Sequence, residues 1–414
     1  MLKKTLPLIL AALVTLPGLW LKLSGAHLTP PPAALLSGLA ILGASFLLLW
    51  ACDVAQMDIP QTLALAVVAL IAVLPEYAVD MYFTWQAGKN PGSDYAHYAI
   101  ANMTGANRLL IGVAWTSIAA IHWLKTRRRV FLNQDQRTEV LFLGMATAYA
   151  FLIPIKGTLA WYDGLVFFGI YAWYLRLAAQ RPCEDCELEG PAELIGALPR
   201  DRRRLATVAL FLFAAGVILA SAELFSENLV ASGKVFGINE FLLVQWLAPI
   251  ASEAPEFIVA IMFVLRGQAA VAMGSLLSSK LNQWTLLVGM IPAVYGAASG
   301  GFETPLPLGP YQLHELFLTA AQSLLAVALL ASLSLGPGAA LLLFFMFTGQ
   351  LVGPYILEGL NLDLPWGNGP SNGTDGVHQL FSAGYVALFA CVVWMKRRDV
   401  WDLRRGTAVE QKIM

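Results

Sequence analysis

The sequence predicts an all-α, polytopic membrane protein that is built from two inverted repeats. Hydrophobic residues make up 58% of the 414 residues and charged residues only 13%, with a mean hydropathy of +0.65. Such a chain has too little polar surface for a soluble protein of this length. The apolar residues also fall into long segments, and two of these segments contain the same pair of residues, Pro75-Glu76 and Pro255-Glu256.

The apolar segments have the length of membrane helices. A bilayer core of about 30 Å requires about 20 mostly apolar residues per helix, and the alternating pattern of a β-barrel strand is not seen in them. The first span follows Lys3-Lys4 and resembles a signal peptide, but no small-residue cleavage site follows promptly, so we expect an anchor helix within residues 1–30. We expect twelve helical spans, at residues 5–23, 34–51, 61–86, 94–121, 138–153, 160–178, 205–231, 238–265, 267–297, 312–333, 337–358 and 377–396.

Lysine and arginine predict the orientation of these spans. With twelve spans, the basic clusters at 125–129, 202–204 and 396–398 all emerge on one side of the membrane. Because cytoplasmic connections are enriched in Lys and Arg, we expect both termini in the cytoplasm and a plasma membrane of the bacterial type.

Composition and short motifs exclude several other classes of protein. The formal net charge of -1 favours no nucleic-acid partner. Cys183 and Cys186 form a C-x-x-C pair, but no second Cys pair or His cluster accompanies them, and four tetrahedral ligands cannot be assembled locally. We expect no cofactor, and the oligomeric state stays open. Four histidines lack metal-ligand spacing and are expected to be interfacial or solvated: His97, His122, His314 and His378.

The polar stretch 179–204 divides the chain near its middle. Each half contains one Pro-Glu span that is followed by a span rich in small residues, 101–107 in the first half and 274–280 in the second. By the span count, the first Pro-Glu helix runs outward and the second runs inward, so the repeats are inverted. We expect an anchor helix at 1–30, a first membrane repeat at 31–178, a cytoplasmic linker at 179–204, a second membrane repeat at 205–358, and a C-terminal helix and tail at 359–414.

The two Pro-Glu pairs predict an ion site at membrane depth. A carboxylate near the middle of a membrane helix costs about 2.5–3.5 kcal/mol on insertion, so two in matching contexts point to function. We expect Pro75 and Pro255 to break their two spans, because each removes a helix hydrogen bond, to the carbonyl of Ile71 and of Ala251 respectively. Carboxylate and carbonyl oxygens are ligands for hard cations such as Na⁺ and Ca²⁺. Inverted repeats with interrupted helices are the architecture of many secondary transporters, in which the substrate binds near the midplane.

The same segments resemble the two α-repeats of the sodium/calcium (cation/Ca²⁺) exchanger superfamily, whose motifs run approximately G-T-S-L-P-E and G-N-x-x-G-S-N. Leu74-Pro75-Glu76 and Asn102-x-x-Gly105-Ala106-Asn107 are similar to the first repeat, while Pro255-Glu256 and Gly274-x-x-x-Ser278-Ser279 match the second more loosely. The resemblance implies cation ligands at Glu76, Glu256 and Asn102, a hydroxyl ligand at Ser252 in place of the motif's threonine, and Ser275 in place of its Asn or Asp. As an alternative, Asn102 and Ser275 could simply serve a close helix crossing.

Several positions depart from the motifs of this family. Ala72 and Val73 remove two hydroxyl groups from the first motif, and Glu253 adds a carboxylate to the second. Lys280 replaces the last Asn of the second motif, and Arg108 directly follows the first motif. These two cations are expected to tune the charge of the site.

The predicted site contains four carboxylates on two helices. Asp80 lies one turn after Glu76, and Glu253 lies three residues before Glu256, so each pair can share a helix face. The four carboxylates carry more charge than Lys280 and Arg108 can neutralise. A divalent ion, two monovalent ions or shared protons could balance the remaining negative charge. We further expect Lys280 to pair with Glu253 or Glu256, because a buried ammonium needs a carboxylate.

These features predict a secondary active cation antiporter that exchanges Ca²⁺ or another cation for Na⁺ or H⁺ by alternating access. Its partners would be inorganic cations and the lipid bilayer. Two alternatives stay open: a degenerate, non-transporting membrane protein, suggested by the eroded second motif, and a membrane-embedded enzyme. The sequence offers no nucleophile or metal triad for an enzyme, so we expect no enzymatic activity.

Overall fold

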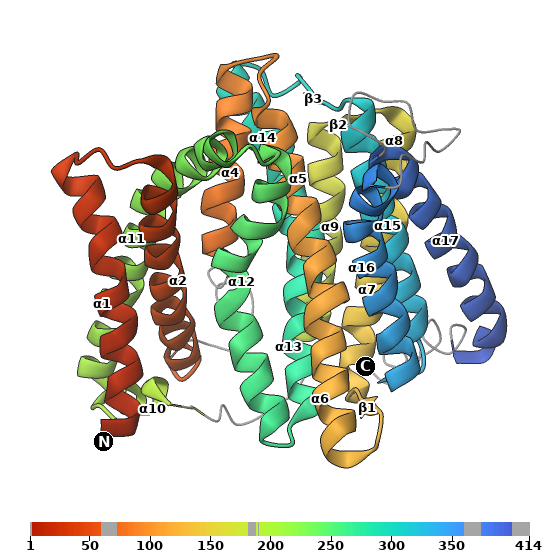
Figure 1. Ribbon diagram of the computed structural model, residues 1–414. Coiled ribbons are helices and arrows are strands. Elements are labelled where there is room, and N and C mark those ends of the chain that lie inside the picture. Colours follow the sequence, from red (N-terminus) through yellow and green to blue (C-terminus); the bar gives the residue numbers. More distant parts are fainter. Residues whose placement is uncertain (1, 59–72, 181–187, 189, 360–373, 400–414) are drawn as a thin grey trace. The chain divides into compact units, whose positions relative to one another are not determined.

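The structure, a computed structural model, describes residues 2–58, 73–180, 188, 190–359 and 374–399 (Figure 1). The described residues divide into two compact units. Unit 1 comprises residues 1–102, 172–256 and 297–301, and unit 2 comprises residues 103–171, 257–296 and 302–414. Four helices begin in one unit and end in the other: α5 (Tyr95–Leu109), α9 (Trp161–Ala178), α12 (Glu240–Leu265) and α14 (Val288–Ser299).

Unit 1 is built around long apolar helices that pack side by side. Helix α2 packs along both α1 and α11, and α1 also contacts α11 (Figure 1). Its 37 residues give α11 a length of about 55 Å, well beyond the apolar core of a bilayer. The helices that lie wholly in this unit are α1 (Leu2–Ser24), α2 (Pro30–Ala55), α4 (Leu74–Lys89), α10 (Pro191–Gly196) and α11 (Arg200–Phe236).

Unit 2 contains the remaining helices and four short strands. Helix α15 packs against α7 and α17, and α17 also packs against α16. Its elements are η1 (Leu110–Trp115), α6 (Thr116–Thr126), β1 (Val130–Phe131), η2 (Gln134–Gln136), α7 (Arg137–Ala150), α8 (Leu152–Lys156), β2 (Thr158–Leu159), α13 (Ala269–Asn282), η3 (Gln283–Leu287), β3 (Leu306–Pro307), α15 (Pro310–Leu330), β4 (Ser334–Leu335), α16 (Pro337–Gly359) and α17 (Thr374–Met395).

The strand pairing in unit 2 shows that the repeats are inverted. Strands β1 and β3 precede the equivalent helices α7 and α15, whereas β2 and β4 follow them. Strand β1 pairs with β4, and β2 pairs with β3, both antiparallel. The start of α7 therefore lies beside the end of α15, and the end of α7 beside its start. Exchanging the two repeats converts one strand pair into the other, which is the symmetry expected of inverted-topology repeats.

The two repeats also share a local irregularity. Both α5 in the first repeat and α13 in the second run directly into a π-helical turn, η1 and η3, before the chain continues as an α-helix. Such turns change the partner of each carbonyl, are rare, and occur frequently at functional sites. Their appearance directly after both small-residue motifs supports the internal repeat that the sequence predicts.

The predicted all-α membrane fold is confirmed. Nine helices of the described residues are long and apolar enough to cross a membrane. Each of the twelve predicted spans overlaps one or more described helices. Because residues 59–72 lie outside the described part of the chain and several spans contain shorter helices, the number of twelve spans and the domain boundaries stay predictions.

One expectation about the Pro-Glu spans is wrong. The second span is not interrupted, because α12 continues through Pro249 and Pro255 to Leu265. Pro255 has no N–H that could donate to the Ala251 carbonyl, so one helix hydrogen bond is missing, but the helix does not end there. In the first span, α4 begins at Leu74 with Pro75 in its first turn, where a proline fits well. Residues 59–72, including Ile71, lie outside the described residues.

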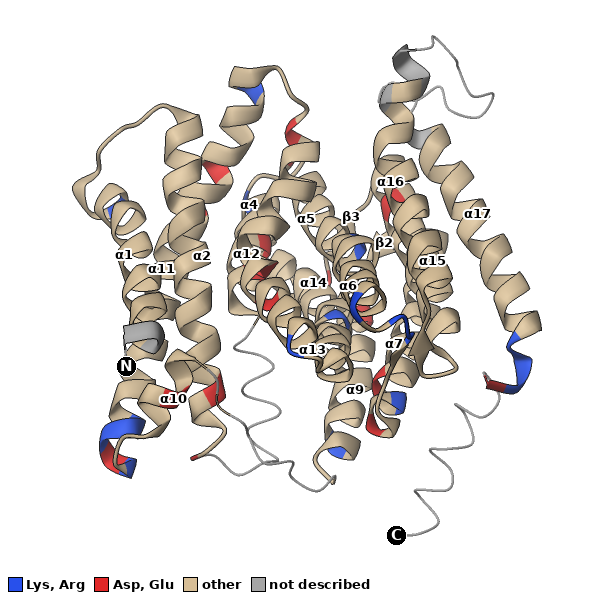
Figure 2. Ribbon diagram, turned by 60° about the horizontal axis from the view of Figure 1, so that its bottom comes forward, with Lys and Arg blue, Asp and Glu red and all other residues tan. Residues whose placement is uncertain are grey.

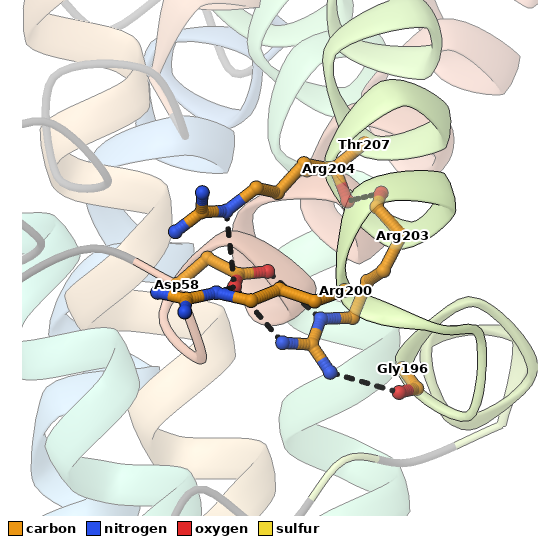
Figure 3. Close-up of polar contacts among 6 residues, drawn as sticks. All are labelled: Asp58, Gly196, Arg200, Arg203, Arg204 and Thr207. Atoms are coloured by element: carbon orange, nitrogen blue, oxygen red, sulfur yellow. Dashed lines mark hydrogen bonds and ion pairs between the residues drawn. The ribbon is translucent and has the colours of Figure 1, made fainter.

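A cluster of ion pairs connects Asp58, just after the end of α2, to the start of α11. The Asp58 carboxylate accepts two hydrogen bonds from the Arg203 guanidinium, at 2.8 Å and 2.9 Å, and a third from Arg204 at 3.3 Å (Figure 3). Arg200 lies 3.6 Å from the same carboxylate, and Arg203 also donates to the Gly196 carbonyl of α10. Figure 2 shows this charged turn beside α10, while the flanks of the long helices carry few charges.

The Asp58 cluster predicts a specific acid sensitivity. The arginines, chiefly Arg203, lower the pKa of Asp58 from 3.8 to about 2. Because the folded-state pKa is depressed, the stabilisation is present above the ordinary carboxyl pKa and is lost as the pH falls toward 2. We expect Asp58→Asn to lower the thermal unfolding midpoint at neutral pH and to reduce its decline between about pH 4 and 2. Asp94→Asn, whose side chain is 76% exposed, serves as the control; equal profiles for the wild type and Asp58→Asn would contradict the assignment.

Candidate functional site

Two of the predicted carboxylates lie one turn apart in α4. Glu76 stands in the first turn of this helix, directly after Pro75, and its side chain is 2% exposed. Asp80 follows one turn later and is fully buried. Carboxylates near a helix N-terminus are favoured by the helix dipole, which offsets part of the cost of burying Glu76.

Asp80 makes a direct contact with a predicted amide ligand. The Asn102 amide donates from Nδ2 to Oδ1 of Asp80 over 3.2 Å, and both residues are buried. The second carboxylate oxygen, Oδ2, is also buried and accepts no hydrogen bond from the described residues. The Asn102 side-chain carbonyl and the Asp80 carboxylate thus provide oxygen atoms from α4 and from the part of α5 that belongs to unit 1.

The second Pro-Glu motif lies in the part of α12 that belongs to unit 1. Glu253 is buried, with 3% of its surface exposed, whereas Glu256 is half-buried. The Ser252 hydroxyl lies 3.3 Å from the carbonyls of both Ala248 and Pro249 and donates within its own helix. Ser252 therefore keeps its oxygen lone pairs available as acceptors.

The four carboxylates do not form a compact cluster in this conformation. Across the parts of the chain that the structure describes, three or more His, Cys, Asp or Glu side chains nowhere approach closely enough to hold a metal ion. A cation bound by these residues would need amide, hydroxyl or backbone carbonyl oxygens as well, which hard cations accept readily. The predicted metal-ligand set thus stays a prediction.

Lys280 in unit 2 contacts Asn107, the residue at the equivalent motif position of the first repeat. Its side chain is fully buried, and Nζ donates to the backbone carbonyl of Asn107 over 3.1 Å and to Asn107 Oδ1 over 2.7 Å. The ammonium also lies 4.6 Å from the centre of the Trp284 ring, a cation–π contact. Asn107 and Lys280 occupy equivalent motif positions, and equivalent residues contact each other only next to a two-fold axis. The predicted pairing of Lys280 with Glu253 or Glu256 joins residues of different units and stays a prediction.

Arg108 belongs to a second buried network in unit 2. Its guanidinium forms an ion pair with Glu315 of α15, both at most 1% exposed. The other Glu315 carboxylate oxygen lies 3.0 Å from Nδ1 of His378 in α17, and the Gln322 amide donates to the Arg108 carbonyl over 3.3 Å. Glu315 is not among the predicted site residues, although a carboxylate inside a predicted span is a signal for function.

Three further sequence-based expectations have different outcomes. His378 is 5% exposed, so the expectation of a solvated histidine is wrong for this residue, whereas an interfacial position stays a prediction. Ser275 is exposed on α13, whereas Ser279 of the same helix is buried. Cys183 and Cys186 lie outside the described residues.

Long apolar helices, inverted repeats and carboxylates buried within those helices define a multi-pass membrane transporter. Comparison with known proteins identifies the group. The family model of the sodium/calcium exchanger protein matches residues 32–179 and 206–354. The chain belongs to this family of membrane ion exchangers and is not an enzyme.

Individual relatives agree with this assignment. The crystal structure of the H⁺/Ca²⁺ exchanger CAX is similar over 100% of this chain and 99% of its own, with 42% identity and a TM-score of 0.90. A putative antiporter, CaxA of Alkalimonas amylolytica, is 25% identical over 256 residues, which are 59% of this chain and 75% of that protein. The sodium-calcium exchanger NCX_Mj shares the fold, with a TM-score of 0.51 and 16% identity over 77% of this chain and 96% of its own.

Proposed function

We propose that this protein exchanges Ca²⁺ for H⁺ across a membrane, using buried carboxylates that bind either a calcium ion or protons. The observation that carries the proposal is the arrangement of Glu76, Asp80 and Asn102. Two buried carboxylates one turn apart, one of them bonded to an amide, provide the hard oxygen ligands that Ca²⁺ takes.

The charge of this site supports exchange between these two ions. Two ionised carboxylates in a low-dielectric interior are costly in free energy unless a cation is bound or protons neutralise them. One Ca²⁺ or two protons restore the same charge, so the site can be neutral in both loaded states. Carboxylates that share protons in this way titrate as a coupled set. Competition between Ca²⁺ and H⁺ for the same oxygens then links their movements in opposite directions.

Protons are favoured over Na⁺ as the coupling ion for two reasons. Ala72 and Val73 stand where the first motif of the family has hydroxyl residues, and Ser275 of the second motif is exposed, so few oxygen atoms remain for additional Na⁺ ions. The relative that matches this chain over nearly its full length, CAX, is described as an H⁺/Ca²⁺ exchanger. The proposed mechanism is alternating access of the carboxylates to the two sides of the membrane.

We also propose a membrane topology for the chain. The basic clusters at 125–129, 202–204 and 396–398 favour cytoplasmic termini and insertion in a plasma membrane, with membrane repeats at 31–178 and 205–358.

Flux measurements in proteoliposomes test the proposed exchange. We expect ⁴⁵Ca²⁺ to enter vesicles with an acidic lumen in the absence of Na⁺, and to stop entering when a protonophore dissipates the pH gradient. A Na⁺ gradient alone should drive little uptake. Uptake that follows the Na⁺ gradient and ignores the pH gradient would establish Na⁺ coupling instead. Ca²⁺ flux that responds to neither gradient would reject an antiporter, and the absence of protein-dependent uptake under both gradients would favour the degenerate, non-transporting alternative.

A further inference from the structure

The first third of α11 carries an exposed row of side chains that takes no part in the proposed exchange. Arg200, Arg204, Val208 and Leu212 follow one another at intervals of four residues, so they lie along one face of this helix. The exposed fractions are 70% for Arg200, 47% for Arg204, 54% for Val208 and 64% for Leu212. Over a length of about 18 Å, the row thus changes from two guanidinium groups to two apolar side chains.

The apolar half of the row belongs to a surface that faces lipid in a membrane. Leu205, beside the row, is 72% exposed, whereas Ala214 and Ile218 on the other side of α11 are fully buried in a cluster with α2. Because α11 is about 55 Å long and the apolar core of a bilayer about 30 Å, the helix extends into the headgroup region. Arg200 and Arg204, which precede the apolar surface, therefore stand at the height of lipid headgroups.

The guanidinium groups of the row are only partly used by the fold. Arg203 binds both oxygens of Asp58 and is 15% exposed. Arg204 makes one contact of 3.3 Å with the same carboxylate, and Arg200 makes one of 3.6 Å (Figure 3). Since each guanidinium has five N–H donors, Arg200 and Arg204 keep donors for a second anion.

The charge around the row favours an anionic partner. Asp58 can neutralise one of the three guanidinium groups that surround it. Arg202 and Asp201, both exposed, add one charge of each sign, and Glu193 of the neighbouring helix α10 adds one negative charge. Positive charge therefore remains in excess among these residues. Arginine binds phosphate through parallel N–H···O contacts, and a basic residue near anionic lipid contributes about 1 kcal/mol to membrane binding.

We propose that Arg200 and Arg204 bind the headgroup of an anionic phospholipid, such as phosphatidylglycerol, whose acyl chain packs along Val208 and Leu212. The phosphate accepts hydrogen bonds from two guanidinium groups one turn apart, and the chain covers apolar surface that the fold leaves exposed. Arg203 keeps its contacts with Asp58. Because such a lipid binds the folded protein and not the unfolded chain, it stabilises the fold.

Thermal unfolding of the full-length protein in a neutral detergent tests this proposal. Phosphatidylglycerol and phosphatidylcholine with identical acyl chains are added in separate series. We expect phosphatidylglycerol to raise the wild-type midpoint by about 2–6 °C more than phosphatidylcholine does. The double variant Arg200→Gln/Arg204→Gln should lose at least half of this difference. Equal shifts from both lipids in the wild type, or an undiminished difference in the double variant, would overturn the proposal.

Two controls separate this site from other effects of charge. Arg397→Gln/Arg398→Gln removes two exposed arginines just after α17 and should keep the wild-type difference between the lipids. Inorganic phosphate at the same concentration should not reproduce the shift, because it has no acyl chain to cover Val208 and Leu212. Equal stabilisation by inorganic phosphate would show a site for the free ion and would overturn the lipid assignment.

A measurement on the wild type alone guards against variants that do not fold. Salt screens contacts between exposed charges, with a Debye length of about 10 Å at 0.1 M and about 3 Å at 1 M. The difference between phosphatidylglycerol and phosphatidylcholine should therefore shrink when NaCl is raised over this range. A difference that salt leaves unchanged would contradict a headgroup held by Arg200 and Arg204. These outcomes are independent of whether the protein exchanges Ca²⁺ for H⁺.

Discussion

Glu76→Gln is expected to abolish Ca²⁺ uptake into proteoliposomes. Glutamine keeps nearly the shape of glutamate and one side-chain oxygen, but it can neither bring a negative charge to a divalent ion nor carry an exchangeable proton. Removing one charged partner from a buried ionic interaction costs about 3–5 kcal/mol, which corresponds to roughly 10²–10⁴-fold in Ca²⁺ affinity. Glu256→Gln, at the equivalent motif position of the second repeat, should have an effect of the same order.

The control for both variants is Glu303→Gln, which makes the same chemical change at an exposed position in the connection between α14 and α15. All three proteins should be compared for folding by size-exclusion profile and thermal midpoint before their fluxes are interpreted. Wild-type uptake in both Glu76→Gln and Glu256→Gln would contradict a mechanism based on these carboxylates.

Replacing Lys280 should change how transport depends on pH. The sequence-based hypothesis is that this ammonium acts on the transport carboxylates as a permanent cation. Its removal would then make protons easier to bind, since a nearby positive charge disfavours carboxylate protonation. We therefore expect Lys280→Asn and Lys280→Ala to shift the pH midpoint of Ca²⁺ uptake upward or to change the number of protons exchanged per Ca²⁺.

The contact with Asn107 makes the two Lys280 variants informative as a pair. Both remove the hydrogen bonds to the Asn107 carbonyl and Oδ1, but the Asn side chain offers its own amide as a replacement donor. Loss of stability alone should therefore be larger in Lys280→Ala, while a charge effect should be the same in both. Lys234→Asn removes an exposed lysine and is the matched control. Unchanged pH dependence and stoichiometry in both Lys280 variants would contradict the hypothesis.

The helices and their inversion could be predicted from the sequence because the membrane imposes a local rule. Every backbone polar group in the bilayer must be satisfied within a helix, so long apolar segments reveal helices without any knowledge of tertiary contacts. The pair Glu76 and Asp80 follows from the same logic, since residues one turn apart on a helix are neighbours. Asn102 donates its amide to Asp80, and the ligand role that the family resemblance implies for Asn102 stays a prediction.

Contacts between distant segments could not be predicted in this way. Arg108 and Glu315 lie 207 positions apart, and Lys280 reaches Asn107 across 173 positions. Neither separation leaves a periodic signal in the sequence. The continuity of α12 through Pro255 could not be predicted either. A proline removes one hydrogen bond in any helix, but the neighbouring groups determine whether the helix ends there.

Ca²⁺ and protons are proposed to compete for the same buried carboxylates. Titration calorimetry in buffers of different ionisation enthalpy counts the protons released when Ca²⁺ binds to the purified protein, and so tests this competition. At a pH where the site is protonated, we expect the wild type to release between one and two protons per Ca²⁺ bound, as the charge balance of two carboxylates requires, roughly following their coupled titration. Ca²⁺ binding with unchanged affinity and no proton release, at every pH at which the protein is folded, would contradict the account.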